Sequence, residues 1–318
     1  MPDQDRSALA PPPRGRPRPW LRATALFGIT LVTSVIQPSV LVAVPFLALA
    51  ATMGMRRFPV LAAALLATVI AVTGGSADGI WYVERGWALL VAGWFTAVTL
   101  RRPASPFSRR ALVSVAGAAV VVGLLLSVRS GAWGTIEWAV KDRMTHSVGT
   151  AMEAWRVLRG GEALPPTLVS AVYQTVEAQA SVFPAMLGIA SMAGLGVAWW
   201  LYVRLSSGED GGLGPLRDFR FNDHLVWLFI AGLLLVVLRW GDSLARVGAN
   251  AVVFMGALYA LRGAAVIMFL SGGLSLFGYI LLGVGLVFVP PLVLTGAMVI
   301  GIGDTWLDVR NRVGSEAA

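Results

Sequence analysis

The longest uncharged stretch of the chain comprises residues 263–303, GAAVIMFLSGGLSLFGYILLGVGLVFVPPLVLTGAMVIGIG. It exceeds the roughly 20 apolar residues that one helix needs to cross the hydrocarbon core of a bilayer. Pro290 and Pro291 interrupt it, and a proline lacks the backbone N–H that a continuous helix uses. The stretch therefore predicts a membrane segment built either as one kinked, tilted helix or as two short helices.

Further uncharged apolar runs occur along the whole chain. They cover residues 23–55, 58–77, 86–100, 111–128, 178–203 and 247–261. The chain is 57% hydrophobic and 13% charged, whereas a soluble domain carries about 25% charged residues. A helix satisfies its own backbone hydrogen bonds, as lipid requires. We therefore predict an all-α integral membrane protein, a polytopic helical bundle with proline-broken helices.

The net charge of +8 comes almost entirely from arginines that cluster at the ends of the apolar runs. This placement is typical of cytoplasmic loops in bacterial inner-membrane proteins. The loop at residues 101–110 carries four arginines and is the best cytoplasmic marker. The expected partner is the lipid bilayer, and no nucleic acid is expected because no basic stripe with interleaved aromatic residues occurs.

The number of spans depends on the proline breaks. Run 23–55 is too long for one crossing and contains Pro38 near its middle, which favours two short helices. Splitting this run and the 263–303 run gives about ten transmembrane spans, and splitting neither gives about eight. With ten, both termini lie in the cytoplasm. We expect a multi-pass protein of the bacterial inner (cytoplasmic) membrane with a cytoplasmic amino terminus.

These patterns divide the chain into five segments. Residues 1–19 form a Pro- and Arg-rich cytoplasmic tail that is expected to be disordered. Residues 20–129 form the first half of the membrane bundle, and residues 181–309 form the second half. Residues 130–180 form an amphipathic helical segment on the extracytoplasmic side, and residues 310–318 form a cytoplasmic or exposed tail.

The amphipathic segment is identified by apolar residues at three- and four-residue spacing, with charged residues on the other faces. Its apolar positions are Trp133, Ile136, Val140, Met144, Val148, Met152, Trp155 and Leu158. A second amphipathic helix begins after Pro165 and Pro166. We expect the pair to lie along the outer membrane surface or to cap the bundle.

Three short motifs carry a family resemblance. They are FRFNDHLVW at residues 219–227, the stretch from Asn250 through Tyr259 to Gly263, and GDTWLDVR at residues 303–310. With them the chain resembles the YybS-like membrane proteins, domain of unknown function 2232. The layout of that family is similar to the substrate-binding membrane subunits of energy-coupling-factor transporters and, more distantly, to MreD-type cell-shape proteins. The resemblance implies a transport subunit, although residues 131–179 have no counterpart in those small subunits.

Arg262 is the most informative single residue because it interrupts a long apolar region. An arginine at the centre of a membrane helix costs about 2.5–3.5 kcal/mol on insertion scales, so it requires compensation. It either extends its side chain to the cytoplasmic headgroups or faces the bundle interior and meets a carboxylate, an open helix end or an anionic ligand. Glu84 and Asp304 are the first candidate partners.

Other candidate functional polar residues flank the last spans. Asn222 and Asp223 precede a helix and are natural amino-terminal caps, a role we favour over binding. Asp304 and Asp308 lie one helical turn apart and share a face, which allows either a docking or cation site or an ordinary solvated helix end. Arg310, the last residue of the GDTWLDVR motif, is a further candidate functional residue.

The sequence shows no catalytic, metal or cofactor-binding pattern. Its two histidines, His146 and His224, are far apart, it has no cysteine, and its one lysine, Lys141, is not in a phosphate-binding loop. Gly256, Ala260 and Ala264 recur at four-residue spacing, which favours close packing within the bundle. We expect a protein without a cofactor that is not an enzyme.

Two functions are compatible with these features. The first is a small-molecule transport subunit that lacks its own ATPase and works with a separate ABC-type ATPase. The second is a non-enzymatic membrane scaffold for envelope or cell-shape machinery, bound to envelope-assembly proteins. The first is favoured by the resemblance, the proline-broken helices and the arginine within the membrane. The second is favoured by the large amphipathic segment.

Overall fold

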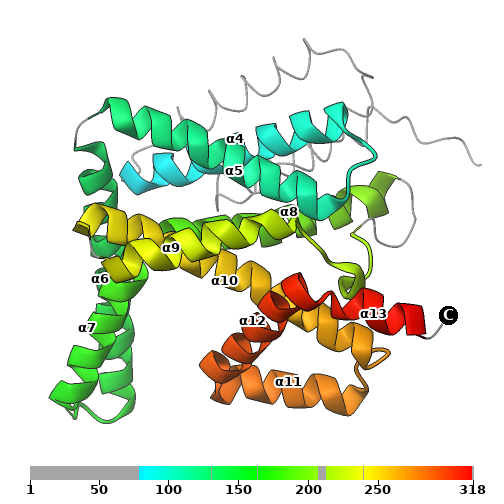
Figure 1. Cartoon of the computed structure of the whole chain (residues 1–318). Helices are drawn as coiled ribbons and strands as arrows, with labels where there is room; N and C mark the ends of the chain where they lie inside the picture. Colours follow the sequence, from blue (N-terminus) through cyan, green and yellow to red (C-terminus); the bar gives the residue numbers. More distant parts are fainter. Residues whose placement is uncertain (1–78, 130, 163, 207–212, 239, 317–318) are drawn as a thin grey trace, which may run out of the picture.

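The computed structural model describes residues 79–316 except residues 130, 163, 207–212 and 239 (Figure 1). The predictions for the tail at residues 1–19, for the break at Pro38 and for run 58–77 lie outside the described residues.

The described residues are helical, with no strand among them. The helices are α4 (Gly79–Arg101), α5 (Phe107–Val128), α6 (Ala132–Leu158), α7 (Pro166–Ser181), α8 (Phe183–Ser206), α9 (Val226–Leu238), α10 (Asp242–Leu270), α11 (Leu276–Phe288), α12 (Pro290–Leu307) and α13 (Val309–Glu316). The short 3-10 helices η2 (Leu216–Asp218) and η3 (Asp223–Leu225) lie between α8 and α9. The prediction of an all-α polytopic membrane protein is confirmed.

Within the described part of the chain, 4 helices are long and apolar enough to cross a membrane: α5, most of α8, α10 and α12. Helices α9 and α11 are apolar but have only 13 residues each. Helices α4, α5, α8 and α9 run roughly side by side, and α10 crosses obliquely beneath them (Figure 1).

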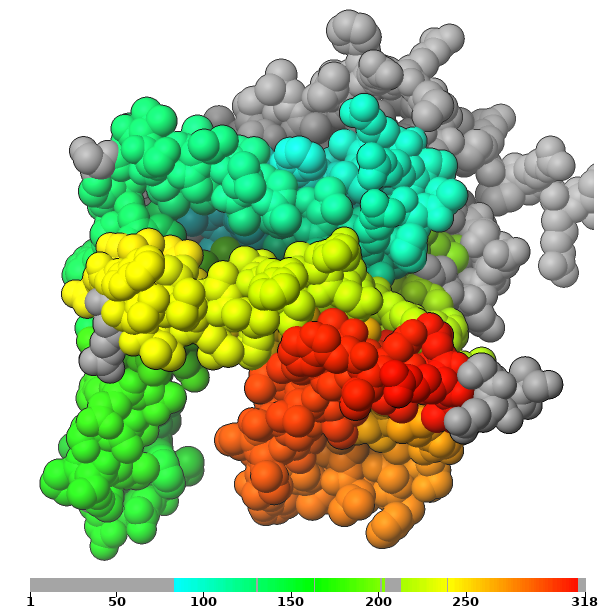
Figure 2. Space-filling model, viewed as in Figure 1, coloured from blue at the N-terminus to red at the C-terminus, as the bar shows by residue number. Residues whose placement is uncertain are grey.

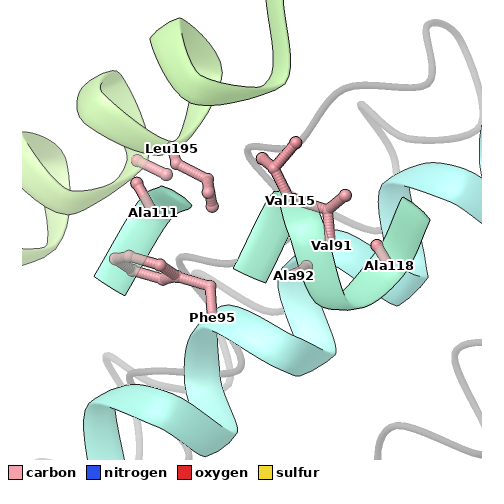
Figure 3. Close-up of a cluster of buried hydrophobic side chains, with 8 residues drawn as sticks. Val91, Ala92, Phe95, Ala111, Val115, Ala118 and Leu195 are labelled. Carbon is pink, nitrogen blue, oxygen red and sulfur yellow. The ribbon is translucent and has the colours of Figure 1, made fainter. Parts of the chain in front are cut away.

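One core cluster joins α4, α5 and α8. Its fully buried members include Val91, Phe95, Ala111 and Leu195 (Figure 3). The ring of Phe95 makes an edge-on contact with the ring of Trp199, with centroids 6.0 Å apart. Small residues such as Ala111 let α5 approach α4 closely enough for these side chains to interlock.

Helix α10 makes the closest helix contact of the bundle with α12. A Cβ atom at Gly263 would lie 1.7 Å from the carbonyl oxygen of Ala297, and one at Gly301 would lie 2.0 Å from that of Tyr259. Only glycine fits at these two positions. The predicted stripe of small residues also packs here, since a Cβ at Gly256 would lie 3.3 Å from the sulfur of Met298.

The long run 263–303 forms the end of α10 and two further helices. Helix α11 ends at Phe288, and α12 begins at Pro290, where the first helical position needs no N–H donor. Of the two alternatives left open by the sequence, the structure has two short helices. They form a hairpin that protrudes from the side of the bundle (Figure 1).

The predicted amphipathic helices are present as α6 and α7, which pair with each other and run across one end of the bundle (Figure 1). Val140 and Ala180 form the buried contact between them. Polar contacts fix the base of the pair: Glu84 of α4 binds Arg143 at 2.7 Å, and Arg246 of α10 binds Glu137. We call α6 and α7 together the arm.

Candidate functional site

A buried ion-pair network lies at the end of the bundle opposite the arm. Its central residue is Asp304 of α12, which is only 1% exposed. The Nε of Arg262 donates a hydrogen bond to Oδ2 of Asp304 at 2.9 Å, and a second nitrogen of Arg262 donates to Asp223 at 2.5 Å. Arg262 is itself 3% exposed, so the alternative in which it reaches the headgroups as a lipid-facing anchor is wrong.

Arg310 supplies the second cation of the network. One of its terminal nitrogens donates to the same Oδ2 of Asp304 at 2.8 Å. The other donates to the carbonyl oxygens of Arg217 and Phe219 at 3.1 Å and 3.0 Å. Arg310 therefore connects the end of α12 to the segment that precedes α9.

The backbone at Asp308 makes this geometry possible. Its φ of 43° lies in the left-handed region, and no other described non-glycine residue has a positive φ. The turn ends α12 and starts α13 in a new direction, which brings Arg310 back to Asp304. Asp and Asn tolerate this conformation better than most residues because their short polar side chains bond locally. Here the side chain of Asp308 accepts a hydrogen bond from Asn311 at 2.6 Å.

Aromatic rings exclude water from one side of the network. The guanidinium of Arg262 lies over the ring of Phe221, 5.6 Å from its centroid. That ring makes an edge-on contact with Tyr259, which is fully buried. A charge in such surroundings is costly unless it is paired, and here one buried carboxylate is shared by two buried guanidinium groups.

The remaining predicted residues occupy different places. Asn222 accepts a hydrogen bond from the backbone N–H of His224 at 3.0 Å, as a cap does. Asp223, for which a cap was favoured, instead binds Arg262. Asp308 lies 3.6 Å from Arg220 at the surface. Glu84 as a partner of Arg262 is wrong, because it binds Arg143 at the arm.

Phe221, Arg217 and Arg110 were not among the individual candidate functional residues expected from the sequence. Arg110 is buried against Trp199, with its guanidinium carbon 4.2 Å from the ring centroid. A signal was available for Arg110, because it follows three other arginines and directly precedes an uncharged helix. Nothing in the sequence indicates that the backbone carbonyls of residues 217 and 219 act as acceptors.

The chemistry of this site is electrostatic and mechanical. The carboxylate of Asp304 is neutralised by two guanidinium groups and makes a poor base. The described residues contain no group of three His, Cys, Asp or Glu side chains that could hold a metal ion. The network instead connects four elements: α10, α12, α13 and the segment 217–223.

These features define a multi-pass α-helical membrane protein. Buried arginines connect its membrane helices to polar segments at one end of the bundle. The chain belongs to the family of predicted membrane proteins described as DUF2232, whose model matches residues 23–305. This confirms the YybS-like resemblance. The match includes Asp223, Arg262 and Asp304 and ends before Arg310. No curated protein and no solved structure shows significant similarity to the chain.

Proposed function

We propose that this protein is the membrane subunit of a small-molecule transport system of the bacterial inner membrane, that it is not an enzyme, and that a separate ABC-type ATPase supplies its energy. The observation that carries the proposal is the buried network. It links the tight crossing of α10 and α12 inside the membrane to exposed elements at one end of the bundle. A partner docked there acts directly on the membrane helices.

The distribution of arginines supports a cytoplasmic location for this end. The turn after Arg101 and Arg102, the segment 213–225 and α13 all lie there, on the right in Figure 1. Arginine-rich connections stay in the cytoplasm during insertion. The arm lies at the other end, which is therefore extracytoplasmic, and the proposal keeps the cytoplasmic amino terminus that the arginine pattern leads us to expect.

The face offered to the ATPase consists of α13 and residues 213–220. Leu216 and Val313 are exposed there, 39% and 42%, among charged residues such as Arg217 and Arg312. Apolar residues surrounded by polar ones are typical of a protein interface. Movement of α13 is transmitted to α12 through the contact of Arg310 with Asp304.

Copurification tests this proposal. The protein is purified from native membranes without a crosslinker, and its partners are identified by mass spectrometry. We expect an ABC-type ATPase, and we expect Val313→Glu or Leu216→Glu to remove it. Val157→Glu, which places the same charge at an exposed position on the arm, is the matched control and should retain it. Recovery without any ATPase, or equal recovery from all variants, would contradict the proposal.

The arm favours a second function, a non-enzymatic scaffold for envelope or cell-shape machinery. Its outer half exposes Trp155, Leu158 and Tyr173, and its base is fixed by ion pairs with α4 and α10. A rigid surface of this kind suits a protein partner outside the membrane. In the same purification, envelope-assembly proteins without an ATPase, lost in Val157→Glu, would favour this second function.

A further inference from the structure

Arg110 is a buried cation for which the described part of the chain supplies no anion. It is 4% exposed, close to the 3% of Arg262 and of Arg310. Those two arginines share the carboxylate of Asp304. Arg110 forms no ion pair with a described residue, and its Nε is buried without a hydrogen-bond partner among them. A buried charge is costly unless it is paired, so Arg110 lacks the compensation that the other two arginines have.

Aromatic rings from two helices hold the guanidinium of Arg110 in place. Its central carbon lies 4.2 Å from the ring centroid of Trp199 on α8 and 5.9 Å from that of Phe95 on α4. The ring of Phe95 also makes an edge-on contact with Phe107 of α5, at 5.9 Å. The face of a ring attracts the charge of a guanidinium, but it offers no oxygen acceptor to the five N–H donors. The rings therefore fix the position of Arg110 without satisfying its hydrogen bonds.

The start of α5 adds free N–H donors beside this arginine. Arg110 lies in the first turn of the helix, and helical side chains lean towards the amino terminus. The cap position is Pro106, no side chain caps this end, and the first turn contains no acidic residue. The N–H groups of a first turn have no partner within the helix and carry a partial positive charge. A helix start of this kind binds phosphate groups in many proteins, and an arginine fork beside it strengthens such a site.

The surroundings of Arg110 are strongly cationic. The other three arginines of the turn 101–110 are exposed, and none of them forms an ion pair with a described residue. The nearest acidic residues along the chain are Glu84 and Glu137, and both bind arginines at the base of the arm. Figure 2 shows the turn and the start of α5, in cyan, at the same end of the molecule as α13, in red. Charge balance at this end therefore favours an anion from outside the described chain.

We infer that Arg110 binds one phosphate group. The guanidinium donates hydrogen bonds to two phosphate oxygens, and the free N–H groups at the start of α5 donate to a third. A phosphate suits the site better than a carboxylate, because it has oxygens for both sets of donors and its charge lies beside four arginines. The headgroup of an anionic phospholipid and a soluble phosphate share this chemistry. The binding does not depend on the proposed transport function or on an ATPase.

Ligand binding to the delipidated full-length protein tests the inference. Two probes are titrated at constant ionic strength. Phosphatidylglycerol is counted as bound lipid by native mass spectrometry, and inorganic phosphate is followed by the midpoint of thermal unfolding. We expect saturable binding of at least one probe, weakened about tenfold or more in Arg110→Met, as the loss of a charge-assisted hydrogen bond predicts. Arg109→Met, which removes the same charge at an exposed position of the same turn, is the matched control and should retain the affinity.

The two probes also identify the source of the phosphate. It is the probe whose binding depends on Arg110, and if both depend on it, competition between them decides. No saturable binding of either probe, or equal affinities of Arg110→Met and the unaltered protein, would overturn the inference. An equal loss in Arg109→Met would show a diffuse effect of charge rather than a site, and would also overturn it.

Hydrogen exchange of the unaltered protein keeps the test decisive if Arg110→Met does not fold. At a saturating concentration of the probe, amide exchange should slow in a peptide that covers residues 105–111, where the free N–H groups of α5 lie. Exchange in a peptide that covers residues 120–126, farther along the same helix, should stay unchanged. Exchange at residues 105–111 that the probe does not alter would contradict the inference. Neither readout involves an ATPase, so the proposed function can fail or succeed separately.

Discussion

Arg246 and Arg262 lie on the same helix, α10, and each binds a carboxylate from another element at opposite ends of the bundle. Arg246 binds Glu137 of the arm, and Arg262 binds Asp304 of α12. At about 1.5 Å per residue the two arginines are about 24 Å apart along the helix axis, which is close to the thickness of the hydrocarbon core. The two ion pairs therefore fix α10 at two separate points, to the arm and to α12.

Removing the charge of Arg262 should destabilise the protein. In Arg262→Leu, Asp304 keeps only Arg310, and breaking a buried ion pair from one side costs about 3–5 kcal/mol. We expect a lower midpoint in thermal unfolding of the detergent-solubilised protein, with Arg262→Lys intermediate because it keeps the charge but loses the two-nitrogen geometry. Arg262→Gln should also remove transport or ligand binding. If Arg262→Leu raises stability and leaves function intact, the network has no functional role.

Adding one methyl group at the crossing of α10 and α12 should separate the two helices. In Gly301→Ala the new carbon meets the backbone carbonyl of Tyr259, which cannot move aside as a side chain can. We expect a loss of at least about 1–3 kcal/mol, the usual cost of overpacking. Gly296→Ala, on the same helix with no atom within 4 Å of the added carbon, is the control. Equal stability of the two variants would show that the helices are farther apart than described.

Labelling of single introduced cysteines can determine which side of the membrane each loop faces, because the chain has no cysteine of its own. Ser105→Cys lies in the arginine-rich turn after α4, and Ser147→Cys is exposed on the arm. In intact spheroplasts an impermeant maleimide should label the second and not the first, because only the arm faces outward. Labelling of Ser105→Cys in intact cells would reverse the assignment of the two sides.

A charge on the inner face of the arm should detach it. Val140 is 5% exposed, and Met144 packs beside it. Asp at either position would be buried without a partner, at a cost of several kcal/mol. We expect Val140→Asp and Met144→Asp to increase proteolysis of residues 132–181, whereas Ser147→Asp on the exposed face should be tolerated. Equal behaviour of all three would mean that the segment is a solvated loop.

Much of the helical architecture was predictable because membrane helices follow simple local rules. The uncharged run 111–128 lies within α5, and the apolar spacing of residues 133–158 predicted α6. The contact of Arg262 with Asp304 was also among the expected pairs, since a buried cation requires an anion and few acidic residues lie near the last spans.

Other contacts depend on geometry that the sequence does not encode locally. The role of Arg310 requires the left-handed turn at Asp308, without which an extended α12 would carry the arginine away from Asp304. A pattern of small residues predicts close packing but does not say that Gly263 and Gly301 are the crossing point. The assignment of Glu84 failed for a topological reason. Glu84 lies in the second turn of α4, and α4 ends at the arginine-rich turn, so Glu84 lies at the opposite end of the bundle from Arg262.

The order in which the chain is synthesised gives the Arg262 network a further consequence. Asp223 precedes Arg262 by 39 residues, and Asp304 follows it by 42. When α10 enters the membrane from the ribosome, Asp223 is the one carboxylate of the network already made. Arg262 can therefore pair only with Asp223, which lies at the surface, until α12 has been made and Asp304 becomes available. A nascent chain that stops before α12 lacks the buried carboxylate that pairs with Arg262, so this network closes only when α12 has been made.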